Sequence, residues 1–263
     1  MNLRGGLAII RGQLFGFLSS KGFFWTLALG WMTGPVIYLL VWTAASSGGA
    51  IGGYDKNGFV LYYLSLIIVN QLTYPTSHWS TGEAINNGSI ASALLRPLPL
   101  IYGDIGCDMA VKIVCMPFVA VVTVSLGLLF KVQVDFKLED LGMALAALAF
   151  ALVIRFLLAH ILSLLAFWTQ QSGALLSLND TFIFLFAGQA APLALFPGFL
   201  RELAGFLPYR YMVSYPVEVL MGKLSPGEIG RGFLLQFVWM LVLVLICYIV
   251  NKKGLKKHSA VGG

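Results

Sequence analysis

Charged side chains that interrupt long apolar stretches are the residues of this chain best placed to do chemistry. Arg155 lies within the run ALVIRFLLAH, and Asp180 lies in the next apolar stretch. Charge is costly inside a hydrocarbon layer, so such residues usually face a partner or a cavity. Two roles are possible for Arg155: it contacts an anionic substrate or headgroup, or it pairs with Asp180. From the rise of a helix, the two residues differ in membrane depth by on the order of 10 Å. We favour the pairing.

A second charged group, Asp104, Asp108 and Lys112, lies at the start of another apolar stretch. Asp108 and Lys112 are four residues apart, which places them on one helix face and allows them to pair. We predict that the three residues form a solvated helix entry.

Conventional catalytic and metal-binding patterns are absent from the sequence. No C-x-x-C, H-x-x-x-H or G-x-S-x-G pattern occurs, and the only Gly-Lys pair, Gly222-Lys223, is followed by Leu224, which excludes a phosphate-binding loop. We therefore predict no enzyme activity, metal or cofactor in this chain. The cysteines are scattered, and we predict that each is a small buried hydrophobic residue: Cys107, Cys115 and Cys247. The histidines are scattered as well: His78, His160 and His258.

The elements that must position these residues are membrane helices. The chain is 59% hydrophobic and 11% charged, with a mean hydropathy of +0.86, whereas about a quarter of the residues of soluble domains are charged. Six apolar stretches can each cross a bilayer. They lie near residues 24–45, 58–78, 107–130, 141–167, 175–195 and 232–250. We predict an all-α polytopic membrane protein with one six-span domain over residues 23–250.

The two ends of the chain are predicted to lie outside this bundle. Residues 1–22 lack the pattern of a signal peptide, and their apolar spacing favours a helix lying in the membrane surface. That spacing is set by Leu3, Leu7, Ile10, Leu14, Phe17 and Leu18. Residues 251–263 form a basic tail.

Lys and Arg counts favour an orientation with both termini in the cytoplasm. That orientation places nine of these residues inside: Arg4, Arg11, Lys21, Arg96, Lys112, Lys252, Lys253, Lys256 and Lys257. It places seven outside: Lys56, Lys131, Lys137, Arg201, Arg210, Lys223 and Arg231. The net charge of +6 then faces anionic membrane lipid, and no nucleic-acid partner is needed.

The longest inner loop, residues 79–106, contains a predicted amphipathic helix from Glu83 to Leu95. Its apolar stripe is formed by Ile85, Ile90, Leu94 and Leu95. Its other face carries Asn86, Asn87, Ser89 and Ser92. The pair Arg96-Pro97 ends it, because proline disfavours helical geometry in the preceding residue. We favour a docking surface for another protein over a helix that only rests at the membrane interface.

The outer segment, residues 191–231, is too proline-rich for one helix and too apolar for a plain loop. Its prolines are Pro192, Pro197, Pro208, Pro216 and Pro226. Short helices that dip back into the outer leaflet would satisfy both facts if protein shields their backbone. The alternative is a hydrophobic cap on the outer surface.

Two motifs in these loops carry a family resemblance. The first is Leu94-Leu95-Arg96-Pro97-Leu98-Pro99-Leu100 after the second stretch. The second follows the fifth stretch and combines GQAAPLALFP (188–197), FLPY (206–209) and YPVE (215–218). In this order and spacing, and with six spans, the chain resembles the membrane subunits of bacterial type-2 ABC exporters over nearly its whole length.

The resemblance implies a permease half that works as a dimer with an identical or related chain in the bacterial inner membrane. Cytoplasmic partner subunits would bind ATP and Mg and push the docking helix, which consists of Glu83, Ile85, Asn86, Asn87, Ile90, Leu94, Leu95 and Arg96. The second and fifth spans would line a path for a hydrophobic or amphipathic substrate. The candidate path residues are Asn70, Gln71, Tyr74, Asn179, Phe182, Phe186 and Gln189. For the two phenylalanines we favour ordinary helix packing, and for Asn70 and Gln71 both interpretations stay open.

Two other classes of protein remain as alternatives. An ion- or proton-coupled secondary carrier would need no ATPase, but such carriers often show internal repeats and intramembrane carboxylates, and Asp180 is the plausible carboxylate here. The third class is a membrane scaffold without transport.

Overall fold

The computed structural model describes residues 3–19, 21–95, 98–133 and 138–257. No strand occurs among these residues, and a single bridge between Ile51 and Tyr54 closes a turn. The helices are α1 (Leu3–Ser19), α2 (Lys21–Ala45), α3 (Lys56–Thr73), α4 (His78–Asn86), α5 (Ile90–Leu94), α6 (Ile101–Leu129), α7 (Leu138–Leu164), α8 (Ser172–Phe186), α9 (Gly198–Phe206), α10 (Pro208–Met212), α11 (Ser214–Leu220) and α12 (Pro226–Lys257), with 3-10 turns at Ser46–Gly48, Leu165–Phe167 and Leu193–Leu195. The all-α prediction is confirmed.

A helix lies at each predicted apolar stretch, but the helices differ in length. Three segments, in α6, α7 and α12, are long and apolar enough to cross a membrane by length and composition alone, among the residues described. By contrast, α8 has 15 residues, or about 22 Å of helix, against a hydrocarbon thickness of about 30 Å. The predicted fifth span, 175–195, is therefore not one continuous helix.

The second predicted span also ends early, at Thr73 rather than at residue 78. Pro75 explains this end, because it lacks a backbone N–H and disfavours helical geometry in the residue before it. Tyr74 accordingly has an extended backbone, with ψ at 123°. Residues 74–77 form a non-helical link between α3 and α4, which becomes important for the site.

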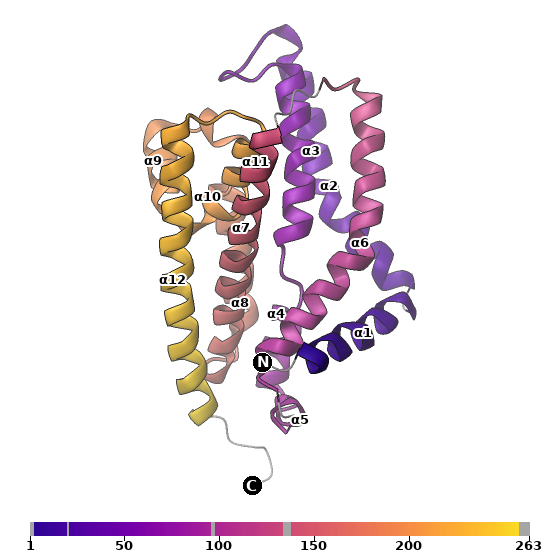
Figure 1. The fold of residues 1–263 in the computed structure, drawn as a ribbon, viewed down its shortest axis with the longest axis vertical. Helices are drawn as coiled ribbons and strands as arrows, with labels where there is room; N and C mark the ends of the chain where they lie inside the picture. The colour runs from indigo at the N-terminus through magenta and orange to yellow at the C-terminus, as the bar shows by residue number, and fades with distance from the viewer. Residues whose placement is uncertain (1–2, 20, 96–97, 134–137, 258–263) are drawn as a thin grey trace.

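Figure 1 shows α2, α3 and the upper part of α6 standing beside α7, α8 and α12, with α1 lying across the lower part of α6. The start of α1, the helices α4 and α5 and the end of α12 lie at the lower end. The loop before α3 and the helices α9 to α11 lie toward the upper end. Both ends of the described chain are therefore on the same side as α4 and α5.

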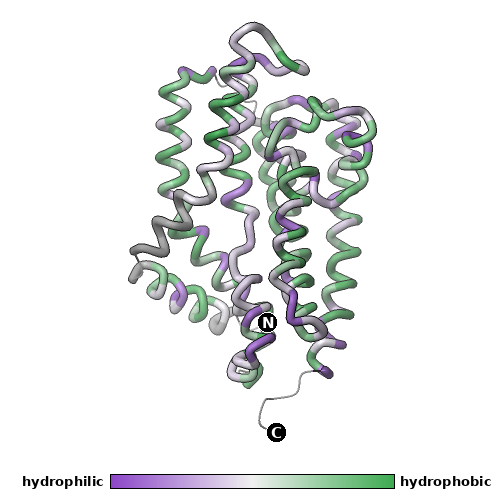
Figure 2. Tube along the Cα trace, turned by 180° about the vertical axis from the view of Figure 1, so that it is seen from behind, coloured by the Kyte–Doolittle hydropathy of each residue, from purple (hydrophilic) through white to green (hydrophobic). Residues whose placement is uncertain are grey.

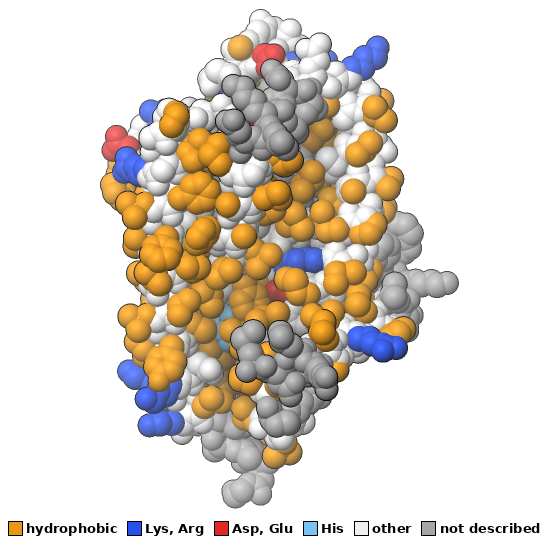
Figure 3. Space-filling view, in the orientation of Figure 1, with side chains coloured by type: hydrophobic (Ala, Val, Ile, Leu, Met, Phe, Trp, Pro, Cys, Tyr) orange, Lys and Arg blue, Asp and Glu red, His pale blue; other side chains and the backbone are white. Residues whose placement is uncertain are grey.

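The surface has the banded pattern of a protein that has lipid as its solvent. In Figure 2 the upright helices are green along most of their length, and purple gathers toward the loops and around α4. In Figure 3 the basic and acidic side chains cluster mainly near the two ends, with a broad hydrophobic band between them. On α12 alone, Leu234, Leu241, Leu245 and Ile249 are exposed. The chain is a multi-pass membrane protein.

The segment that follows α8 is attached to the centre of the bundle by α3. The hydroxyl groups of Tyr62 and Tyr63, both fully buried, donate to the carbonyl oxygens of Gly188 and Ala190 at 2.8 and 2.9 Å. This satisfies backbone groups that a helix end would otherwise leave unpaired in lipid. It also places Gln189 beside α3.

The outer segment forms short helices, as its prolines predict. Nearly all of α11 is buried, and α11 packs against α7 and α3, so the polar backbone there is shielded by protein. The buried Gln236 of α12 donates through Nε2 to the carbonyl oxygens of Ala147 and Tyr211. Gly232 lets α12 approach the ring of Tyr215, since a Cβ atom at this position would overlap the ring.

The predicted helix from Glu83 to Leu95 is wrong as a single helix. The chain turns after Asn86, and Gly88 takes a φ of +79°, which favours glycine and separates α4 from α5. Ile85 and Ile90 are buried in a cluster with Leu164 and Phe167, whereas Leu95 is 87% exposed and does not belong to the apolar stripe. Residues 96 and 97 lie outside the described residues.

Candidate functional site

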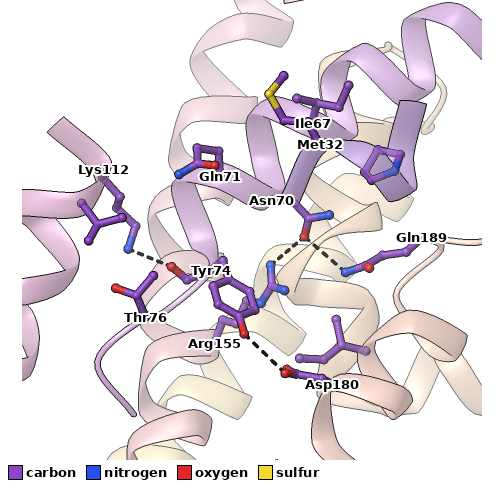
Figure 4. Close-up of a pocket in the computed structure, with 13 residues that line it drawn as sticks. Met32, Ile67, Asn70, Gln71, Tyr74, Thr76, Lys112, Arg155, Asp180 and Gln189 are labelled. Atoms are coloured by element: carbon purple, nitrogen blue, oxygen red, sulfur yellow. Dashed lines mark hydrogen bonds between the residues drawn. The ribbon is translucent and has the colours of Figure 1, made fainter. Parts of the chain in front are cut away.

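A cavity of about 120 Å³ lies where the end of α3 meets α6, α7 and α8. Asn70 and Gln71 come from the last turn of α3, Tyr74 is the first residue of the link that follows it, and Gln189 comes from the segment that Tyr62 and Tyr63 hold in place. The remaining lining residues are Met32, Pro35, Ile67, Thr76, Val111, Lys112, Arg155, Asp180 and Ile183. Four of the predicted path residues, Asn70, Gln71, Tyr74 and Gln189, are thus brought together around one cavity (Figure 4).

Arg155 is held in this cavity wall by uncharged partners. Its Nη1 atom donates to Asn70 Oδ1 at 2.8 Å and to Thr73 Oγ1 at 2.9 Å, and its guanidinium carbon lies 5.0 Å from the centre of the Tyr74 ring. Gln189 Nε2 donates to the same Asn70 oxygen at 3.2 Å. Asn70 therefore joins α3, α7 and the segment after α8.

The predicted ion pair between Arg155 and Asp180 is absent. The ion pairs within 4 Å among the described residues involve other groups. Tyr74 lies between the two charges: its ring contacts Arg155, and its hydroxyl donates to Asp180 Oδ2 over a long 3.4 Å. Tyr74 takes this place because its backbone leaves the helix one residue before Pro75.

Asp104, Asp108 and Lys112 are buried, so the prediction of a solvated helix entry is wrong. They lie four residues apart along one face of α6, and we call them the α6 ladder. Asp108 and Lys112 do pair, at 3.9 Å. The sequence could not show that α4, α7 and the link between α3 and α4 cover this helix face.

Each member of the α6 ladder holds a different part of the inner end. Asp104 accepts from Thr81 Oγ1 of α4 at 2.6 Å and contacts His160 Nδ1 of α7 at 2.7 Å. Asp108 Oδ1 accepts from the backbone N–H groups of Thr76 and Ser77 at 2.7 and 3.0 Å, and from the Thr76 hydroxyl at 2.9 Å. Lys112 Nζ donates to the carbonyl oxygen of Tyr74 at 3.2 Å. A continuous series of polar contacts therefore runs from α4 to the cavity.

The other predicted path residues lie apart from this cavity. Phe182 is 38% exposed on α8, and its ring and that of Phe186 pack against Tyr209 with ring centres 5.9 and 6.5 Å apart. Within this chain both phenylalanines pack against other side chains, which is the role we favoured for them. Asn179 is buried, and its Oδ1 has no hydrogen-bond partner among the described residues.

The predicted docking residues gather at the lower end of the molecule. Glu83, Asn86 and Asn87 are exposed on or next to α4, while Ile85 and Ile90 anchor the two short helices to the bundle. Asn86 also donates through Nδ2 to the Gln170 carbonyl oxygen and to Ser172 Oγ at 3.3 Å. The exposed face of α4 carries Ser80 and Glu83 together with Trp79, which is 40% exposed, and the buried Thr81 connects this helix to the α6 ladder.

A second, wider cavity of about 760 Å³ opens among α9, α10, α11 and the start of α12. Its main feature is an ion pair between Arg210 Nη2 and Glu218 Oε2 at 2.8 Å. Burial raises the pKa of the Glu218 carboxyl, and the Arg210 guanidinium acts against this shift. Sequence reasoning did not single out this pair, although an arginine and a glutamate eight residues apart, each two positions after a proline, were a usable signal.

Comparison with known proteins agrees with the membrane architecture. Residues 29–262 match the model of the family described as ABC-2 family transporter protein. No curated protein matches the chain. The matched residues include most of α2 and all helices from α3 to α12, and with them the α6 ladder, the lined cavity and the proline-broken segment before α12. The chain therefore belongs to the ABC-2 transporter family and is a type-2 ABC transport permease.

Proposed function

We propose that this chain is the permease subunit of an ATP-driven exporter and forms part of the path for a hydrophobic or amphipathic substrate. ATP and Mg are bound by separate cytoplasmic subunits, and a second permease half, identical or related, completes the path. The observation that carries the proposal is the series of buried polar contacts that joins α4 to the cavity through the α6 ladder.

The exposed face of α4 supplies the surface on which the ATP-binding subunit docks. Ile85 and Ile90 are packed against Leu164 and Phe167, so a force on α4 is carried into α7 rather than lost in a mobile loop. Glu83 and Asn87 stay exposed beside them and supply polar contacts to the partner. Such a surface can drive transport only if its contacts differ between the two states of the partner.

The link between α3 and α4 transmits the movement. Thr76 and Ser77 are bonded to Asp108, and the carbonyl oxygen of Tyr74 is bonded to Lys112. A shift of α4 therefore moves the backbone of Tyr74, whose side chain lies between Arg155 and Asp180. The cavity changes shape as a result, which is the event that alternating access requires.

The proposed membrane arrangement has six spans with both termini and α4 in the cytoplasm of a bacterial inner membrane. The common position of the chain ends and α4 in Figure 1 supports this orientation. The short α8 is extended by the segment up to residue 192, and the buried α11 supports a re-entrant course for the outer helices. Their backbone is shielded by α7 and α3, as lipid requires.

Purification of the full chain from its native membrane tests the proposal. We expect a stoichiometric ATP-binding subunit, and we expect Glu83→Lys to reduce the amount that co-purifies. Glu202→Lys is the matched control, because Glu202 is exposed on α9 near the opposite end. If no ATP-binding subunit appears, or if both variants behave alike, the proposal is wrong. Transport that is abolished by a protonophore but indifferent to ATP depletion would indicate a secondary carrier.

A further inference from the structure

We propose that the cavity at Arg155 binds the anionic headgroup, a carboxylate or phosphate, of an amphipathic substrate. This inference rests on the proposed function, since it names the chemistry of what passes through the same cavity. The first observation is that Arg155 lines the cavity and is only 3% exposed.

Arg155 has more hydrogen-bonding capacity than its protein partners use. A guanidinium has five N–H donors, and this one donates to Asn70 and Thr73, both uncharged. Its Nε atom is buried and has no hydrogen-bond partner among the described residues. A buried cation without a direct counter-charge is costly, and an anion arriving in the cavity would remove that cost.

A second cation faces the same space. Lys112 lines the cavity from α6, and its ammonium lies 3.9 Å from Asp108, outside hydrogen-bonding distance. The described lining contains one carboxylate, Asp180, which already accepts from the Tyr74 hydroxyl. Two cations from two different helices therefore line the cavity with one carboxylate, while Asp108, the ion-pair partner of Lys112, lies outside the lining. The largely apolar walls of this small space concentrate the field of the positive charge in its lining, which favours an anion.

The size of the cavity suits a headgroup and not a whole amphiphile. One water needs about 10–15 Å³ of such space, so 120 Å³ holds on the order of ten waters, or a carboxylate or phosphate with a few. The apolar part of the lining includes Met32, Ile67, Val111 and Ile183. This surface lies beside the charged groups and can receive the first carbons of an attached chain.

A cationic headgroup fits the same cavity poorly. The carboxylate in the cavity lining that could bind a cation is Asp180, which accepts from the Tyr74 hydroxyl. A cation bound to Asp180 would lie close to the Arg155 guanidinium, which covers the Tyr74 ring. The sign of the headgroup is therefore the property to test.

The test measures binding to the purified full chain in phosphatidylcholine vesicles, read as the shift of its thermal unfolding midpoint. The probes are dodecyl phosphate, dodecyltrimethylammonium, dodecanol and sodium sulfate. We expect dodecyl phosphate to raise the midpoint most, and Arg155→Gln to weaken its apparent affinity about ten- to a hundred-fold. Arg155→Lys keeps the charge and should lose less. Arg201→Gln, at an exposed arginine of α9, is the matched control and should not change the affinity.

Two results would overturn the proposal: equal or stronger stabilisation by the cationic probe, or unchanged affinity in Arg155→Gln. Sulfate as effective as dodecyl phosphate would overturn the headgroup assignment in favour of a free anion. If Arg155→Gln does not fold, Lys112→Gln provides the second measurement, and unchanged affinity there overturns the inference. The assay needs no ATP-binding subunit, so its failure is distinguishable from failure of the proposed function, which co-purification decides.

Discussion

Replacing Asp108 with asparagine should destabilise the protein far more than an ordinary polar substitution. Asp108 is 1% exposed, and its Oδ1 accepts three hydrogen bonds of 2.7, 2.9 and 3.0 Å from Thr76 and Ser77. Hydrogen bonds to a charged group contribute about 1.5–3 kcal/mol, against about 0.5–1.5 for neutral ones, so three weakened bonds cost about 3 kcal/mol.

The loss of the ion pair with Lys112 leads independently to a similar figure. The asparagine amide would take the place of Oδ2, which has no hydrogen-bond partner among the residues that the structure describes and lies 3.9 Å from the Lys112 ammonium. A donor would then face a buried cation that has lost its counter-charge. Breaking a buried ion pair on one side typically costs about 3–5 kcal/mol, and we expect Asp108→Asn to fall in this range.

The free energy of unfolding of the purified protein in detergent, measured by denaturant titration, checks this value. Asp55→Asn is the matched control: Asp55 caps α3 through one bond of 2.8 Å to the Gly58 N–H, and asparagine caps helices about as well as aspartate. The double variant Asp108→Asn/Lys112→Met removes the isolated cation, so its loss should be smaller than the sum of the two single losses by about 1 kcal/mol or more.

Equal losses in Asp108→Asn and Asp55→Asn would refute the reasoning, because the α6 ladder would then not be what holds the link between α3 and α4. Additive losses in the double variant would refute a different part of it, namely the interaction between Asp108 and Lys112.

Two glycines give further predictions, both read from the same unfolding free energy. Gly88→Ala places a Cβ at a φ of +79° between α4 and α5 and should cost about 1–2 kcal/mol, whereas Gly103→Ala, at an open position in α6, should cost nothing. If both variants match the wild type, the turn does not need glycine. Gly232→Ala should cost about 1–3 kcal/mol, because its Cβ would overlap the Tyr215 ring and push α12 from α11. Gly230→Ala, in the same helix with open space, is its control, and similar losses in the two would contradict a tight contact.

The sequence predicted the helices well because lipid leaves few alternatives. An apolar stretch in lipid must satisfy its own backbone, and a helix lies within each of the predicted stretches, although two of these helices are shorter than predicted. Proline also acted as predicted in the outer segment, where it separates short helices. The ends of helices were predicted less well: Pro75 ends α3 before the apolar pattern stops, and a hydropathy count does not detect this.

The site was only partly predictable. The amides and tyrosine at the end of α3 could be selected because polar residues in an apolar stretch are few. The partners of these residues could not be selected from the sequence, since Arg155 and Gln189 lie 85 and 119 residues from Asn70 along the chain. The same limitation explains the error on Asp104, which is buried by contacts with α4 and α7 that leave no local pattern.

The burial of the α6 ladder follows from the break between α3 and α4. Where Pro75 ends α3, the N–H groups of Thr76 and Ser77 have no helical partner, and buried unpaired groups of this kind cost several kcal/mol each in an apolar medium. A carboxylate can satisfy both at once, and Asp108 does, with Lys112 beside it to limit the cost of its charge. A polar link made in this way is strong but has few contacts, so it can shift as a unit when α4 moves. The residues that make the break stable are therefore the same residues to which the proposed mechanism assigns the transfer of movement from α4 to Tyr74.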